Sequence, residues 1–182
     1  DSLENSRRAI AIRENIYNAD NKNAFAENAV ARGFQELGRT YLAQDKYMES
    51  ERNFAKAQSL YQKIADSDAG NTTKKARLAE NSALLGYVNG LNLKLAKANE
   101  FFEKSLTIYA DLLNQEKLST LDQRRLVTAY LGYGEVLLKD KQTAKALENL
   151  NKAQELLQNE KVGKDAEREL GKLEELLIKA KK

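Results

Sequence analysis

Three glycines, Gly38, Gly86 and Gly134, recur every 48 residues, and each opens a similar pattern of small and large side chains. Self-similarity at a fixed period is the signature of a repeat architecture, in which each unit buries its apolar face against its neighbours. The chain is therefore expected to build its fold by stacking copies of one small unit.

The positions around each glycine are spaced for helices. Within each half of the pattern the spacing is three or four residues, which places these positions on one face of a helix. The aligned positions are Phe34, Leu37, Gly38, Tyr41, Ser50, Phe54 and Ala57, then Ser82, Leu85, Gly86, Asn89, Ala98, Phe102 and Ser105, then Tyr130, Tyr133, Gly134, Leu137, Ala146, Leu150 and Ala153. Proline is absent and only 9 residues are glycine, so we expect an all-α chain with two helices per repeat.

The order of aromatic, leucine, glycine and tyrosine, followed by a small residue and a phenylalanine, resembles the tetratricopeptide repeat. The first copy matches best, and the small positions hold in all three. The copies that depart from the pattern do so at Ser82 and Asn89 and at Leu137 and Leu150. The resemblance covers nearly the whole chain and implies a right-handed superhelical solenoid of antiparallel helix hairpins, with about eight helices.

The period is longer than the family's usual length of about 34 residues. Each glycine precedes the small residue of the second helix by 12 positions, so the turn inside the hairpin keeps its length. Asn23, Asn71 and Ser119 also recur at the interval of 48, and these residue types are favoured N-caps. We expect the extra residues to lengthen the helices to about 20 residues, as in the repeats of kinesin light chains.

The same interval defines the ends of the array. Ala9 aligns with Ala57, so the chain opens with the second helix of a repeat, and we expect it to be a piece of a longer protein. After Gly163, a leucine stripe with charge on the other face resembles the capping helix that repeat arrays need. The predicted parts of this single solenoid are a half repeat at 1–20, repeats at 21–68, 69–116 and 117–163, and a capping helix at 164–182.

In the tetratricopeptide family the first helices line a concave surface, and the resemblance implies such a groove here. Arg77 and Arg125 align, and with other arginines they would form a fork for a carboxylate or a phosphorylated segment. Tyr87 would supply a large rigid contact. The predicted groove residues are Arg32, Gln35, Arg39, Leu42, Arg77, Glu80, Tyr87, Arg125, Thr128, Leu131 and Glu135.

Several of these residues also have a structural interpretation. Arg77 and Glu80 are three residues apart and would pair on one helix, and Arg39 would meet a glutamate of a neighbouring repeat. Tyr87 would instead shield the seam between repeats. Three further tyrosines match signature positions and are expected in the core: Tyr41, Tyr130 and Tyr133.

The composition argues against several classes of function. The chain has no histidine and no cysteine, and it lacks a phosphate-binding glycine loop, so we expect no catalysis, no metal and no cofactor. The formal charge of +3 is well mixed, and its basic clusters lack interleaved aromatics, so we expect no nucleic-acid partner. No run of 18 apolar residues and no signal peptide is present, so we expect no direct membrane contact.

We therefore expect a non-catalytic protein–protein interaction scaffold whose groove takes a partner peptide or protein. Residues 11–14, followed by Ala19, Asp20 and Asn23, resemble repeats appended to bacterial serine/threonine protein kinases. That resemblance implies a docking or regulatory region of a signalling protein, either cytoplasmic or an extracytoplasmic part of a membrane-anchored protein.

The alternative function is that of a structural spacer or self-association segment. In this interpretation the open N-terminal helix stacks on another copy or on missing upstream repeats, and a contact with another copy would use Ile10, Ile12 and Ile16. The ligand and the compartment remain open at this stage.

Overall fold

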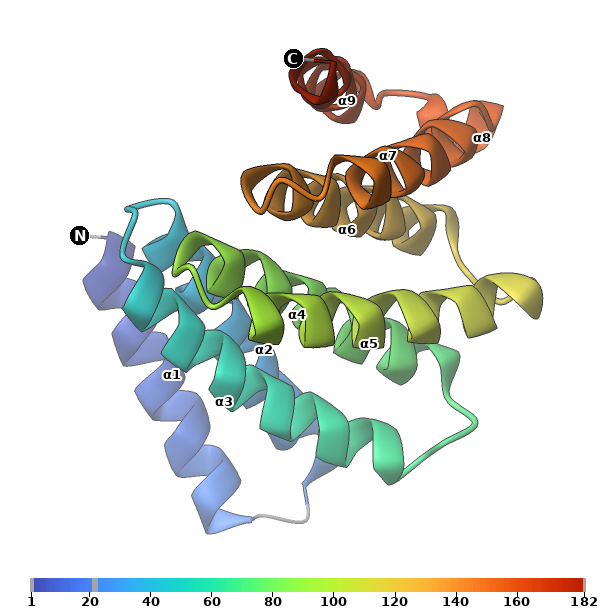
Figure 1. The fold of residues 1–182 in the computed structure, drawn as a ribbon. Coiled ribbons are helices and arrows are strands. Elements are labelled where there is room, and N and C mark those ends of the chain that lie inside the picture. The colour runs from blue at the N-terminus through green and yellow to red at the C-terminus, as the bar shows by residue number, and fades with distance from the viewer. Residues whose placement is uncertain (1, 21–22, 182) are drawn as a thin grey trace. The chain divides into compact units, whose positions relative to one another are not determined.

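The computed structural model describes residues 2–20 and 23–181, and every regular element in these residues is a helix. The nine helices of this described part follow one another along the chain (Figure 1). Their bounds are α1 Ser2–Ala19, α2 Ala24–Leu42, α3 Tyr47–Asp66, α4 Thr72–Leu91, α5 Leu95–Asn114, α6 Thr120–Lys139, α7 Thr143–Leu157, α8 Glu160–Gly163 and α9 Glu167–Ala180. The all-α prediction is confirmed, and α3 to α6 each contain 20 residues.

The chain forms two compact units, Asp1–Asn81 and Ser82–Lys182, and each is described by itself. The division falls inside α4, whose first ten residues belong to unit 1. It therefore does not follow the predicted repeats. The predicted repeat boundaries at 68 and 116 instead lie in the links between α3 and α4 and between α5 and α6.

Three helices begin at the predicted N-caps. Asn23 Oδ1 accepts a hydrogen bond from Ala26 N at 3.0 Å, and Ser119 Oγ accepts one from Asp122 N at 3.1 Å. Asn71 Oδ1 accepts from Lys74 N at 3.2 Å. Each bond satisfies one of the backbone N–H groups that a helix leaves without a partner in its first turn.

The turns inside the hairpins have one geometry. In each turn a backbone N–H donates to a carbonyl five residues earlier, which closes the helix in the Schellman manner. The three donor and acceptor pairs are Lys46 to Tyr41, Lys94 to Asn89 and Gln142 to Leu137, with N to O distances of 2.9–3.0 Å. The residue before each donor has a positive φ: Asp45, Leu93 and Lys141.

The recurring glycines lie where two helices approach each other. In unit 1, a Cβ added to Gly38 would lie 2.6 Å from the ring of Phe54, and Ser50 Oγ donates a hydrogen bond to Gly38 O at 2.9 Å. In unit 2, an added Cβ would lie 2.7 Å from Phe102 at Gly86 and 2.8 Å from Leu150 at Gly134. The predicted packing of a missing side chain against a large one is confirmed in all three hairpins.

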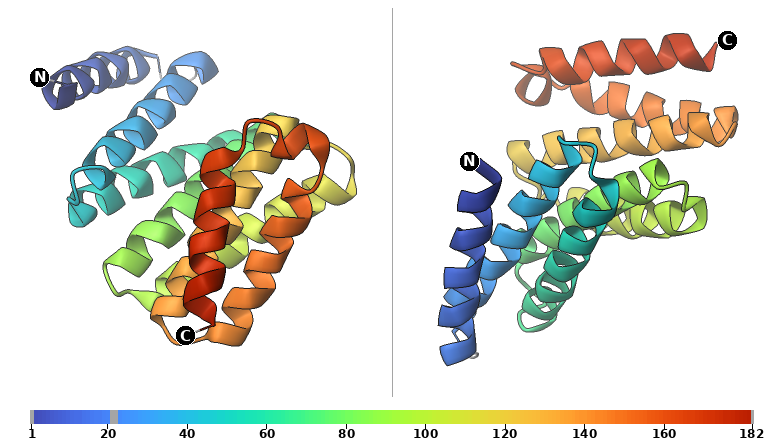
Figure 2. Two further views of the ribbon diagram at one scale, coloured as in Figure 1. Left: turned by 90° about the horizontal axis from the view of Figure 1, so that it is seen from above. Right: turned by 90° about the vertical axis from the view of Figure 1, so that its left-hand side faces the viewer.

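Within unit 1, α1 packs on α2, which in turn packs on α3 (Figure 2, right). Ile10 of α1 is only 4% exposed, and a Cβ added to Gly33 of α2 would lie 2.9 Å from its side chain. At the end of α1, Tyr17 Oη donates to Glu27 Oε1 at 3.1 Å, and Lys63 Nζ of α3 lies 2.6 Å from the same oxygen. Because these polar groups link three helices, they fix α1 at the edge of the unit.

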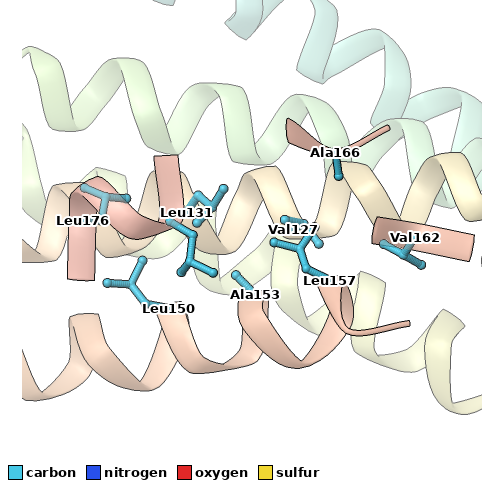
Figure 3. Close-up of a cluster of buried hydrophobic side chains, with 9 residues drawn as sticks. Val127, Leu131, Leu150, Ala153, Leu157, Val162, Ala166 and Leu176 are labelled. Carbon is cyan, nitrogen blue, oxygen red and sulfur yellow. The ribbon is translucent and has the colours of Figure 1, made fainter. Parts of the chain in front are cut away.

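Within unit 2, α9 packs against both α6 and α7. Leu150, Ala153 and Leu157 line one side of α7 and face Leu131 of α6 (Figure 3). Leu176 of α9 lies in the same cluster and is fully buried. The predicted capping helix therefore covers an apolar surface that would otherwise be open to solvent.

The structure adds one element to the predicted set. The short helix α8 follows α7, which ends at Leu157, and α8 begins at the N-cap Asn159, whose side chain accepts from Lys161 N at 3.0 Å. Val162 of α8 is buried in the core cluster. The repeat period predicts a second helix of about 20 residues here, but α7 has only 15 residues and α8 follows it.

Candidate interaction site

Three of the predicted groove residues in unit 1 form one ion-pair cluster. Arg39 Nη2 of α2 lies 2.8 Å from Glu80 Oε1 of α4, and Arg77 Nη1 lies 3.1 Å from Glu80 Oε2. The Glu80 side chain is only 11% exposed. Both structural interpretations of these residues are confirmed, because Arg77 pairs along its own helix and Arg39 pairs with a neighbouring first helix.

The cluster lies beside a buried polar contact. Tyr61 Oη donates to Gln35 Oε1 at 3.4 Å, and both residues are buried. Burial, followed by the charge of Glu80, raises the pKa of Tyr61 to about 12. The prediction that Gln35 faces the groove is wrong, because Gln35 is buried and contacts Tyr61 of α3. Leu42, at the end of α2, is half-buried.

In unit 2, Tyr87 and Glu135 meet across neighbouring first helices. Tyr87 Oη donates to Glu135 Oε2 at 3.2 Å, and both residues are partly buried. Glu135 also pairs with Lys139, and Lys172 Nζ of the capping helix lies 3.2 Å from its Oε2. Burial alone would raise the pKa of Glu135, but the bonds and charges of Lys172 and Lys139 outweigh burial and lower it. The pair therefore links helices within the unit.

The remaining predicted residues of unit 2 have mixed environments. Arg125 Nη1 lies 2.7 Å from Asp122 Oδ1 on the same helix. Thr128 is exposed, and its hydroxyl donates to Arg124 O at 3.1 Å. Leu131 is 4% exposed and belongs to the core beneath α7 and α9, so it does not reach an open surface.

The three signature tyrosines behave as expected of core residues, with one difference of degree. Tyr41 and Tyr133 are 6% and 7% exposed, and the Tyr133 ring stacks on Phe102 at a centroid distance of 4.7 Å. Tyr130 is partly buried and packs on the edge of the core cluster. The predicted core packing is confirmed, with Tyr130 at its margin.

A hollow between α1 and α2 in unit 1 was not identified by sequence reasoning. It has a volume of about 440 Å³ and is lined by Arg13, Ile16, Phe25 and Arg32, among others. Phe25 is 85% exposed and Ile16 is 54% exposed. Only Arg32 belongs to the predicted groove. The signal that could have found the hollow is the repeat alignment itself, which places Arg13 where the second helix of the next repeat has Tyr61.

Two residues of the basic clusters, Lys74 and Arg124, make contacts within the protein. Lys74 Nζ lies 3.2 Å from Asp68 Oδ2, and Arg124 Nε donates to Val162 O at 3.0 Å. The described residues contain no group of three or more acidic side chains arranged to hold a metal ion. In the same residues, no helix combines the length and apolar character that crossing a membrane requires.

Comparison with protein-family models, with curated proteins and with solved structures finds no match. The arrangement of the side chains therefore carries the functional interpretation.

Proposed function

We propose that the chain is a non-catalytic helical-repeat scaffold that binds another protein or a peptide, as the resemblance to tetratricopeptide repeats implies. The observation that carries the proposal is the hollow between α1 and α2, around which large apolar side chains are exposed. Phe25 and Ile16 are the two exposed apolar side chains that line it. Exposed apolar groups that gather at a concave surface, rather than singly, are typical of protein-binding sites.

Most charged residues of the predicted groove contact one another instead of facing an open surface. Glu80 forms ion pairs with Arg39 and Arg77, and Tyr87 donates a hydrogen bond to Glu135. Substituting these residues would disturb contacts between helices, so a loss of binding in such variants would be ambiguous. Arg32 and Thr128 are exposed and give a cleaner test of the groove.

The test is capture followed by reconstitution. The chain is immobilised through its C-terminal end and exposed to a lysate of its source organism, with an unrelated all-α protein of similar charge as the control. Each retained protein is then purified and titrated into the free chain by calorimetry. We expect at least one protein to bind with a defined stoichiometry, whereas failure of every retained protein to bind when purified would refute the scaffold function.

The exposed side of α1 supports a second candidate function, that of a self-association segment. Ile12 is 61% exposed and Ile16 is 54% exposed, one helical turn apart. Ile10, the third residue predicted to take part, is buried against α2, so it supports the fold rather than an outer contact. A dimer that dissociates in Ile12→Ser with Ile16→Ser would favour this function.

A role as the docking region of a bacterial signalling kinase rests on the resemblance of residues 11–14 and the residues that follow. These residues lie in α1 and in the link to α2, next to the hollow. The sequence upstream of this segment in the parent gene tests the idea: a kinase domain there would support it, and a parent protein without one would refute it.

A further inference from the structure

We infer that one end of unit 2 binds the surface of an anionic lipid bilayer and inserts the side chain of Leu93 into it. This hairpin end consists of the α4–α5 turn and the α6–α7 turn with their flanking residues, 91–97 and 139–145. The inference does not depend on the scaffold function. The expectation of no direct membrane contact rested on the lack of a spanning run and of a signal peptide, and binding to a bilayer surface requires neither.

The two turns lie at the same end of unit 2 (Figure 1). Ala98, near the start of α5, is buried in one cluster with Leu137 and Ala146, which lie on either side of the second turn. Leu95 and Leu138 are partly buried and pack against the same cluster. The side chains that the two turns expose therefore belong to one surface.

This surface is basic. Lys97, Lys141 and Lys145 are exposed, and none of the three forms an ion pair with another described residue. Lys139 is paired with Glu135. In total, residues 91–97 and 139–145 contain five lysines and one acidic residue: Lys94, Lys97, Lys139, Lys141, Lys145 and Asp140. The hairpin end therefore presents a local positive charge, although the charges of the whole chain are well mixed.

Two of these lysines occupy positions that disfavour a cation. Lys97 and Lys145 lie in the first turns of α5 and α7, and neither turn contains an acidic residue. The helix dipole stabilises carboxylates in a first turn and destabilises cations there. At the equivalent position in unit 1, α3 has Glu49, which follows this preference. The two lysines therefore add to the charge of the surface at a cost to their own helices.

Leu93 is a second residue type out of place at the same end. Its side chain is 80% exposed, and its φ of 59° lies in the left-handed region, which a leucine adopts only with strain. An aspartate, Asp45, occupies the equivalent position of the first hairpin and tolerates this conformation better. Strain at an exposed apolar side chain indicates a contact that the chain makes outside itself.

The residue types at the hairpin end favour a bilayer over a protein surface. Residues 91–97 and 139–145 contain no arginine and no aromatic residue. Protein interfaces are enriched in arginine and aromatic residues and depleted of lysine. Anionic headgroups attract lysines by charge alone, and the bilayer accepts an apolar side chain without a shaped pocket.

The first test is sedimentation of the full chain with lipid vesicles. The vesicles contain equal parts of phosphatidylserine and phosphatidylcholine, and vesicles of phosphatidylcholine alone are the control. We expect binding only to the anionic vesicles, and the binding should weaken as salt is added because exposed charges are screened. The chain has no tryptophan, so the emission of Leu93→Trp reports on this position alone and should shift to shorter wavelength on binding.

Substitution of the lysines tests the charge of the surface. Lys97→Glu with Lys141→Glu should weaken binding to the anionic vesicles about tenfold or more. The matched control is Lys117→Glu with Lys164→Glu, which changes the net charge equally at two exposed positions outside the hairpin end and should weaken binding far less. Circular dichroism checks that each variant keeps its helix content.

Substitution of Leu93 tests the insertion. Leu93→Asn should weaken binding severalfold, and because asparagine tolerates the left-handed conformation, the fold should not suffer. Leu121→Asn is the control, since Leu121 is 56% exposed at the start of α6, and it should leave the binding unchanged.

Four results would overturn the inference. The chain could bind neither kind of vesicle or bind both equally, the two pairs of lysine substitutions could have equal effects, or the Leu93→Trp emission could stay unchanged on bound vesicles. A purified protein that Leu93→Asn no longer binds, without any vesicle binding, would assign the hairpin end to a protein partner and would also refute the inference. Loss of vesicle binding alone would leave the scaffold function standing, because that function is tested with the retained proteins.

Discussion

At the scale of single residues, close contact between glycine and a large side chain is what the sequence predicts best. A Cβ at Gly38 would come within 2.6 Å of two atoms of the Phe54 ring. The interval of 48 identifies this contact because the small and the large position recur together. The recurrence of small and large positions does not identify buried polar contacts. A buried Asn or Gln has the same spacing in the sequence as an exposed one.

The first prediction compares two glycines within helices. Gly38→Ala should lower the free energy of unfolding by about 1–3 kcal/mol, because overpacking against Phe54 outweighs the better helix propensity of alanine. Gly171→Ala in α9 should raise it by about 0.5–1 kcal/mol, because nothing lies within 4 Å of the added Cβ. Urea unfolding followed by circular dichroism measures both. The same sign for the two variants would contradict the packing role of Gly38.

The second prediction concerns Asn81, which sequence reasoning did not identify. Its fully buried Nδ2 donates to Phe54 O at 2.9 Å and to Gln58 Oε1 at 2.8 Å. Asn81→Asp replaces this donor with an acceptor that faces two other acceptors, and we expect a loss of about 3 kcal/mol or more in the free energy of unfolding. Asn151→Asp, at an exposed position of α7, is the control and should change the stability little.

At the scale of elements, the docking of α9 combines a predicted and an unpredicted part. The leucine stripe predicts a capping helix, and Leu173 and Leu176 are buried as such a helix requires. The ion pair between Lys172 and Glu135 was not predicted, because 37 residues of irregular spacing separate the two positions and no repeat relates them. Polar contacts of this kind depend on how helices cross, which the helical period does not specify.

The third prediction follows from the lowered pKa of Glu135. A carboxyl group whose pKa is depressed by folding stabilises the fold above its unfolded pKa, and the contribution is lost as the pH falls through the folded value. Glu135→Gln should therefore cost about 1–2 kcal/mol near neutral pH. The cost should shrink as the pH falls below the ordinary glutamate pKa of about 4.3.

Urea unfolding of the Glu135 variant at several pH values checks this. Glu148→Gln removes an exposed pair with Lys152 and is the control, because such a pair contributes only a few tenths of a kcal/mol. A pH-independent cost at Glu135 would mean that packing rather than charge holds α9 in place.

At the scale of the whole molecule, the sequence predicts architecture far better than it predicts a site. The N-caps, the hairpin turns and the glycine contacts all follow from the interval of 48. The groove does not, because the interval aligns positions without stating whether their side chains bond to each other: Arg39 pairs with Glu80 across 41 residues, and Tyr87 bonds to Glu135 at the same position of the next repeat. These contacts between helices decide whether a groove side chain is available to a partner protein. Arg13 was missed because its counterparts at the interval of 48, Tyr61 and Tyr109, are both buried. Phe25 was missed because its exposed counterparts, Thr73 and Leu121, do not share its side-chain type.

The fourth prediction separates the two candidate functions of the whole chain. If the chain is a scaffold for other proteins, the chain alone should be a monomer of 20.5 kDa by light scattering. Phe25→Ser should leave that mass unchanged while it weakens binding of the proteins that the chain retains. A mass that doubles with concentration would instead favour self-association through α1.

The matching turns inside the three hairpins bear on how a chain of this kind changes its length during evolution. Because Asp45, Leu93 and Lys141 occupy the same left-handed conformation 48 residues apart, recombination between two neighbouring turns adds or removes one whole repeat. The helix on each side of the new junction then meets a turn of the geometry it already had. A crossover out of this register would bring a large side chain to a position where glycine is needed, so selection should favour exchange between equivalent positions.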